Sequence, residues 1–216
     1  MTGLVRKATL ISVCGLLAAS AAFASVPDPT QCLFPSHINM AGNDGTSGDA
    51  SVQFTVTVKD LAGNAIPNSV VVVDLSGALD LLFCEDQLGN STSDCPTMTV
   101  RQNADAGGVA TFRIIGGATQ ANPLGSPAGH CKIYADGVLL TTIDCGAYDL
   151  DNATGVGGAD LAGWLDDFGN GNNALRADYD GDANVGGADL ASWLDVFGNG
   201  GSGLSCADLS AASCGP

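Results

Sequence analysis

A sixteen-residue segment occurs twice near the C-terminal end of the chain, and this repeat limits the possible folds more than any other feature. "VGGADLAGWLDDFGNG" begins at Val156 and "VGGADLASWLDVFGNG" begins at Val185. The copies differ at only two positions, Gly163/Ser192 and Asp167/Val196. Such a repeat indicates one small structural unit present twice, because a single short unit cannot bury its own hydrophobic face.

Each copy carries apolar residues at the spacing of one helical face. In the first copy, the residues at i, i+3, i+4 and i+7 are Leu161, Trp164, Leu165 and Phe168. The second copy repeats them as Leu190, Trp193, Leu194 and Phe197. Gly169 and Gly198 follow as natural helix ends. The spacing predicts two short helices that bury their Trp and Phe side chains against each other.

A twelve-residue loop rich in oxygen ligands precedes each helix. In the second loop, side chains or carbonyls suited to calcium stand at positions 1, 3, 5, 7 and 12: Asp178, Asp180, Asp182, Asn184 and Asp189. Asn184 would contribute its backbone carbonyl, and a water would serve position 9, which is Gly186. These residues are the predicted stronger Ca²⁺ site.

The first loop has a less complete set of ligands. Its candidates are Asp149, Asp151, Gly155 (through its carbonyl) and Asp160. Ala153 at position 5 offers no side-chain oxygen, so we expect a weaker site. Position 6 is Thr154 in this loop and Ala183 in the second, where a left-handed backbone costs a non-glycine residue on the order of 1 kcal/mol.

The loop pattern D-x-[DN]-x-D-x-x-V-x-x-x-D, followed directly by one helix and given twice, resembles type I dockerin domains. The resemblance covers residues 147–200 and implies a small all-α, calcium-stabilised module that attaches a secreted protein to a cohesin-like extracellular partner. Where such dockerins usually have hydroxyl residues, at loop positions 10 and 11, this chain has Gly158-Ala159 and Gly187-Ala188. Its helices also lack a basic residue.

Residues 26–146 have the pattern of an all-β domain. In "SVQFTVTV" the residues from Val52 to Val58 alternate, and "SVVVVDL" is β-branched enough for a strand buried on both faces. About seven short strands separated by turn residues predict a two-sheet sandwich. The pieces "VKDLAGNAIPNSVVVVD" and "DAGGVATFRI" resemble bacterial immunoglobulin-like domains. The predicted fold class is therefore an immunoglobulin-like sandwich followed by a small all-α module.

Residues 1–24 are typical of a signal peptide. A positively charged start precedes an apolar run, and Ala24 closes a small-x-small cleavage pattern. We therefore expect a secreted or extracellular protein. The run is short for a membrane span, and no later segment is longer, so we expect no membrane span.

Seven cysteines follow the leader, and export favours disulfides. The short loops favour Cys84–Cys95 and, in the Cys-containing tail 201–216, Cys206–Cys214. A two-residue Asp136-Gly137 hairpin turn would pair Cys131 with Thr142 and leave Cys145 out of its reach. Either Cys131 or Cys145 is then expected to pair with Cys32, which leaves one thiol over.

Charge and missing motifs limit the function. The chain has 23 acidic and 7 basic residues, which disfavours nucleic acid and anionic membranes and favours cations. His37 and His130 lie in no nucleophile motif and Glu85 is the only Glu, so we expect no enzyme. The favoured function is cohesin-type docking. The alternative is a calcium-stabilised adhesin, or an immunoglobulin-like protein that binds cell-surface polysaccharide. An Asp-based hydrolase is the third hypothesis.

Overall fold

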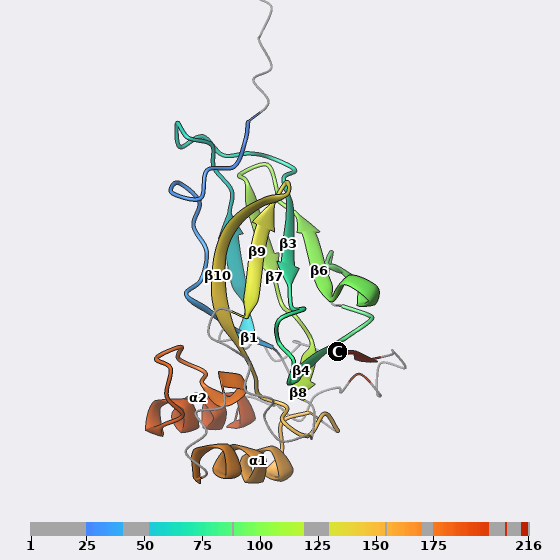
Figure 1. Ribbon diagram of the computed structural model, residues 1–216, viewed down its shortest axis with the longest axis vertical. Coiled ribbons are helices and arrows are strands. Elements are labelled where there is room, and N and C mark those ends of the chain that lie inside the picture. The colour runs from blue at the N-terminus through green and yellow to red at the C-terminus, as the bar shows by residue number, and fades with distance from the viewer. Residues whose placement is uncertain are drawn as a thin grey trace, which may run out of the picture.

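The computed structural model consists of a curved β-sheet structure with two helices and their loops at one end (Figure 1). The residues that it describes are 25–40, 52–87, 89–118, 130–153, 155–169, 175–198, 206 and 213–215. The predicted signal peptide lies outside the described residues, as does nearly all of the tail after residue 200.

In the described part of the chain, eleven strands form three sheets. In chain order they are β1 (His37–Met40), β2 (Phe54–Thr57), β3 (Val70–Asp74), β4 (Leu81–Cys84), β5 (Thr92–Asp94), β6 (Thr99–Asn103), β7 (Val109–Phe112), β8 (Gly116–Ala118), β9 (Cys131–Ala135), β10 (Val138–Ala147) and β11 (Ser213–Cys214). The largest sheet has the order β1-β10-β9-β3-β6-β5, and the others are β11-β4-β8 and β2-β7. All pairs are antiparallel except β1 with β10.

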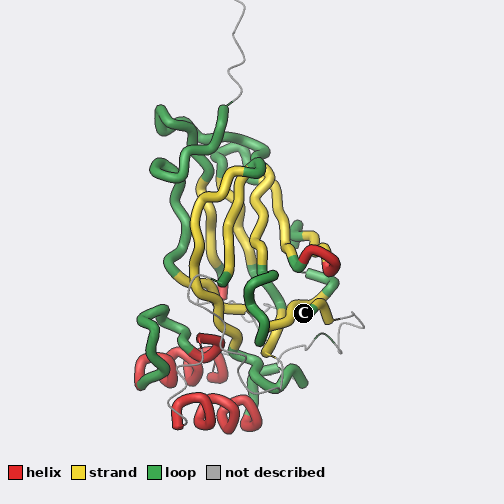
Figure 2. Tube along the Cα trace, viewed as in Figure 1, coloured by secondary structure: helices red, strands yellow, loops and turns green. Residues whose placement is uncertain are grey.

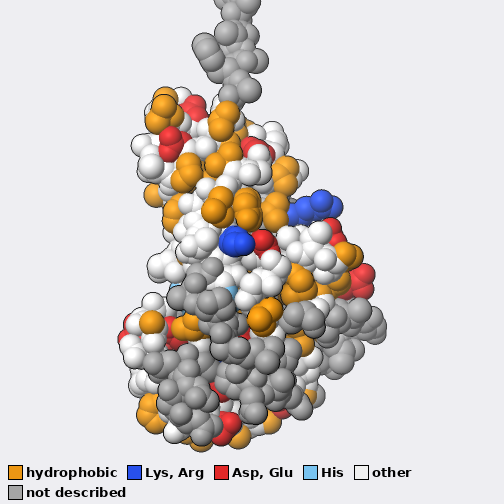
Figure 3. Space-filling view, in the orientation of Figure 1, with side chains coloured by type: hydrophobic (Ala, Val, Ile, Leu, Met, Phe, Trp, Pro, Cys, Tyr) orange, Lys and Arg blue, Asp and Glu red, His pale blue; other side chains and the backbone are white. Residues whose placement is uncertain are grey.

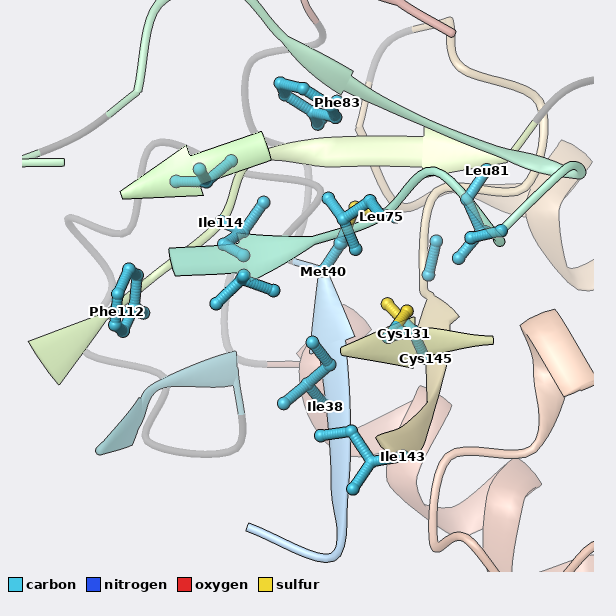
Figure 4. Packing of buried hydrophobic residues seen from close by; sticks show 14 of the residues in the cluster. Ile38, Met40, Leu75, Leu81, Phe83, Phe112, Ile114, Cys131, Ile143 and Cys145 are labelled. Carbon is cyan, nitrogen blue, oxygen red and sulfur yellow. The ribbon is translucent and has the colours of Figure 1, made fainter. Parts of the chain in front are cut away.

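Alternating side chains create the core between the sheets. Val56, Ala110 and Phe112 on the β2-β7 pair are fully buried and belong to the same cluster as Val71 and Val73 on β3. Figure 4 shows part of this packing, with Met40, Leu75 and Phe83 pointing into the same interior. The prediction for "SVVVVDL" was wrong in one respect: β3 buries one face only, since Val70 is 39% exposed.

The outer face of the large sheet is partly apolar. Val70 on β3 and Leu139 on β10 are both exposed, and Figure 3 shows hydrophobic side chains gathered over this face. Of the described helices, none is long and apolar enough to cross a membrane.

The two predicted helices are present as α1 (Gly158–Gly169) and α2 (Gly187–Gly198), with a single 3-10 turn, η3 (Leu175–Ala177), between them. A second 3-10 turn, η2 (Cys95–Thr97), lies between β5 and β6. Figure 2 shows both α-helices below the end of the sheet.

The predicted fold class was wrong in its second half. The chain is mostly β, and the described part of 147–200 contains only two short helices within long loops rather than an all-α module. The buried residues of these loops and helices, among them Tyr148, Trp164 and Trp193, belong to the same cluster as the strands. A two-sheet, immunoglobulin-like arrangement remains compatible with the β part.

The disulfide predictions were also wrong. The bonds join Cys84 to Cys206 and Cys95 to Cys214, because β11 lies beside β4 and brings the tail to this sheet. The sequence separations are 122 and 119 residues, so local loop length gave no guide. Cys32 is a buried free thiol, and its sulfur lies 3.3 Å from the backbone nitrogen of Lys59.

Candidate metal centre

The first loop is held between two strands. It begins directly after β10, and the N–H of Ala118 on β8 donates a 2.7 Å hydrogen bond to the carbonyl of Asp149. Gly117 on β8 lies so close that an added Cβ would stand 2.8 Å from this same carbonyl oxygen. Position 117 in the "IIGGAT" segment therefore needs glycine, because a side chain there would displace the loop from the sheet.

Three carboxylates converge in this loop. Oxygen atoms of Asp149, Asp151 and Asp160 lie within 4.8 Å of one another. Asp149 is 1% exposed, and its Oδ1 accepts no hydrogen bond from the described part of the chain. A buried anionic oxygen without a partner is energetically costly, and a cation is the usual compensation. The cluster is thus short of positive charge.

The pKa of Asp149 reflects the same lack of positive charge. Burial raises the pKa of this carboxyl from 3.8 to about 7, and repulsion by Asp160 and Asp151 adds to the rise. Hydrogen bonds from the backbone of Asn152 and Ala153 oppose it. Burial likewise raises the pKa of Asp160. Bound calcium would favour the ionised form of both groups.

The second loop forms an equivalent cluster that is more open to solvent. Oxygen atoms of Asp178, Asp180 and Asp182 lie within 4.8 Å of one another, with Asp178 buried and the other two exposed. Burial raises the pKa of Asp178, while hydrogen bonds from the N–H groups of Gly181 and Ala183 lower it. The loop therefore bends around the Asp178 carboxylate, which accepts these bonds at 2.8 Å.

The position-12 residues have the same role in both loops. Asp160 accepts hydrogen bonds from the N–H groups of Leu150, Asp151 and Gly157. Asp189 accepts them from Tyr179, Asp180 and Gly186. Each carboxylate ties the start of its loop to the start of the following helix. Asp160 also belongs to its carboxylate cluster, whereas Asp189 is outside the group formed by Asp178, Asp180 and Asp182.

The backbone adopts the left-handed turns that such a loop needs. Position 4 has a positive φ in both loops, 50° at Asn152 and 77° at Gly181. Ala183 at position 6 has φ 69°, as the sequence predicted, whereas Thr154 lies outside the described residues. Gly155 is buried with φ 77°. Asn184 is exposed, and its backbone N–H donates a hydrogen bond to the Asp182 carboxylate within the same loop.

Sequence reasoning missed the residues that fasten the loops to the sheet. Asn39 on β1 donates to the carbonyl of Tyr179 at 2.9 Å and is bound in turn to His37 at 2.7 Å. Tyr148 and Tyr179 stack with ring centroids 4.3 Å apart. The aromatic residue placed beside or within each Asp-rich loop is the signal that could have pointed to this contact.

An ion pair joins α1 to the 3-10 turn η3. Two of the three guanidinium nitrogens of Arg176, Nε and Nη2, donate to the Asp167 carboxylate at 2.8 Å, and both residues are buried. The corresponding residue of α2 is Val196, which is buried without a charge. Arg176 thus has a buried structural partner on α1.

The residues present fit a hard divalent cation. Carboxylate and carbonyl oxygens are the ligands that calcium prefers, and each loop brings three carboxylates together. The first loop, expected to be the weaker one, holds the buried unpartnered oxygen. Comparison of the chain with known protein families, with curated proteins and with solved structures finds no match.

Proposed function

We propose that the two Asp-rich loops bind Ca²⁺ and that this binding stabilises the end of the sheet on which they pack. The observation that carries the proposal is the buried, unpartnered Oδ1 of Asp149 within a cluster of three carboxylates. Asp149, Asp151, Asp160 and the carbonyl of Gly155 would hold one ion. Asp178, Asp180, Asp182, the carbonyl of Asn184 and Asp189 would hold the other.

Calcium supplies positive charge that these carboxylates lack. Without it, Asp149 has to keep a proton or remain as a buried, repelled anion. Because an ion that binds only the folded chain adds its binding free energy to stability, calcium would act as a structural cofactor. The proposal assigns the protein no catalytic role.

We further propose that this end of the protein attaches it to a cohesin-type domain of another extracellular protein. The two helices expose apolar residues at equivalent positions and to nearly equal degrees: Leu165 52%, Phe168 52%, Leu194 50% and Phe197 48%. Acidic residues, Asp166 on α1 and Asp195 on α2, stand beside them and are exposed. Exposed apolar side chains with acidic neighbours on each helix fit a partner that offers apolar and basic side chains.

Binding of the full chain to a panel of purified cohesin domains, in calcium and in chelator, tests this attachment. We expect binding to one or more of them in calcium, loss of that binding in chelator, and at least tenfold weaker binding for Phe168→Ala combined with Phe197→Ala. Leu61→Ala is the matched control, because Leu61 is 76% exposed and precedes the Asp-rich loops by many residues. Absence of any calcium-dependent partner, or equal binding by the Phe variant, would contradict the docking proposal without affecting the calcium proposal.

A second candidate function is polysaccharide binding by the β part. Two neighbouring open hollows share Asn90 and Gln102, and the remaining lining includes Gln53, Arg101 and Arg113. Amide and guanidinium groups are suitable partners for sugar hydroxyls. A glycan array probed with the parent chain and with Gln102→Ala would decide between the two functions. Glycan binding that Gln102→Ala abolishes and chelator leaves intact would favour this candidate over docking.

A further inference from the structure

The pairing of β9 with β10 contains an irregularity that changes the position of two cysteines. The Asp136-Gly137 turn pairs Ala135 with Val138, as the sequence predicted. The register then shifts between Leu139 and Thr141, so that Cys131 stands opposite Ile143 rather than Thr142. Cys145 is then two residues beyond the partner of Cys131, and residues two apart on a strand share a face. The shift therefore places both thiols on the same side of the sheet.

The two thiols meet in the core. Cys131 and Cys145 are both fully buried, and Figure 4 shows their sulfur atoms side by side, pointing toward each other. Burial raises the pKa of the Cys131 thiol well above its usual range, and a hydrogen bond with the Cys145 side chain adds to the rise. The diagonal arrangement on adjacent strands allows such contact.

Four other cysteines of the described residues form two disulfides. Cys84–Cys206 and Cys95–Cys214 indicate that the chain matures under oxidising conditions, in which a neighbouring pair of thiols seldom persists. Cys32, the third free thiol among the described residues, contacts Lys59 instead: its sulfur is 3.3 Å from the Lys59 nitrogen and 3.5 Å from the Lys59 carbonyl oxygen.

We propose that Cys131 and Cys145 form a third disulfide in the mature protein. The S–S bond between the two sulfurs forms as the S–S bond of an oxidant, such as oxidised glutathione or a thiol oxidoreductase, breaks. The two protons and two electrons of the cysteines pass to the oxidant, whose two sulfurs become thiols. The bond closes while the β9–β10 hairpin is still accessible, before the core covers it. It fixes the shifted register near the end of β10, four residues before the first ligand Asp149.

His130 supports this end of the hairpin from the other side of Cys131. Its Nε2 lies 3.2 Å from the carbonyl oxygen of Cys145, and its Nδ1 lies 3.5 Å from a carboxylate oxygen of Asp144. The contacts hold the start of β9 against β10 at the level of the two sulfurs. They keep the backbone of both cysteines next to the strand pairing that brings the thiols together.

Tryptic mapping without reductant tests the proposal. Trypsin cleaves after Arg113, Lys132 and Arg176, so Cys131 and Cys145 fall on the separate peptides 114–132 and 133–176. The full chain is refolded in a glutathione redox buffer, denatured, alkylated and digested. We expect one linked species whose mass equals both peptides less two hydrogen atoms, and alkylation of Cys32.

Two results would overturn the proposal. One is recovery of both peptides separately, each carrying an alkyl group. The other is a link from either peptide to the peptide that contains Cys32. Cys32→Ser is the matched control and should retain the linked species unchanged. The tryptic map of the parent chain decides whether the disulfide forms, even if a Cys131→Ser variant fails to fold.

Discussion

At the scale of single residues, the two differences between the repeats match differences in their surroundings. Gly163 on α1 faces Leu150, whose Cβ would lie 3.3 Å from an added side chain. Its counterpart Ser192 on α2 forms a 2.7 Å hydrogen bond with the hydroxyl of Tyr148. Asp167 pairs with a buried arginine, whereas Val196 is in the apolar core. Both positions at which the copies differ thus contact other parts of the protein.

Because its pKa is raised in the folded chain, Asp149 should make the free energy of unfolding fall as pH rises. In the unfolded chain this carboxyl ionises near 3.8, and in the folded chain near 7. Between these values the folded chain binds more protons, so in chelator its free energy of unfolding should fall as pH rises from about 4 to about 7. The slope should be up to about 1.4 kcal/mol per pH unit. Denaturant unfolding at several pH values measures it.

The variant Asp149→Asn separates charge from shape at this position. In chelator at pH 7 it should be more stable than the parent by about 1–3 kcal/mol, because a buried charge is removed. The same variant should lose the stabilisation that calcium gives through the first loop. A variant that is less stable than the parent in chelator would show that the carboxylate is satisfied without an ion.

At the scale of elements, Asp167 and Arg176 fasten α1. Asp167→Val, which places the α2 residue in α1, should lower the free energy of unfolding by about 3 kcal/mol because the buried Arg176 loses its bidentate carboxylate partner. Combining it with Arg176→Met should recover most of the loss, since a hydrophobic pair of similar volume replaces the ion pair. If the double variant is no better than the single one, the ion pair is not what fastens the helix. Urea unfolding of the three chains provides the comparison.

The contact between β8 and the first loop gives a second prediction at this scale. Gly117→Ala places a Cβ 2.8 Å from the Asp149 carbonyl, so the loop must shift. We expect at least tenfold weaker calcium binding at one site, measured by calorimetric titration. Gly169→Ala is the control, because an added Cβ there meets nothing within 4 Å. Equal weakening in both variants would rule out the specific contact.

The helices also show how far sequence reasoning reaches at the level of elements. Periodicity located α1 and α2 and their glycine ends. It misjudged the buried face, since Trp164 is buried but Leu165 and Phe168 are about half exposed. The helices pack onto the end of the sheet, and Asp160 and Asp167 occupy buried positions because loop N–H groups and Arg176 satisfy them. Apolar spacing alone contains no information about such partners.

At the scale of the whole molecule, the long-range contacts could not be predicted from the sequence. The convergence of the Asp residues followed from local spacing, and the structure brings three carboxylates together in each loop. The disulfides join residues 122 and 119 positions apart, and Asn39 on β1 supports a loop that starts far along the chain. These contacts depend on topology, which local patterns do not encode. As a result, buried residues of the strands, loops and helices belong to one large cluster, beside a small one of Cys84, Ile115 and Cys206.

Because the loops and the sheet share this core, calcium should act on the unfolding of the whole chain. Differential scanning calorimetry of the full chain, in chelator and in a series of calcium concentrations, tests this directly. We predict a single transition whose midpoint rises with calcium, by an amount that corresponds to about 2.7 kcal/mol per site at one hundred times the Kd. The same midpoint in chelator and in calcium would contradict the account.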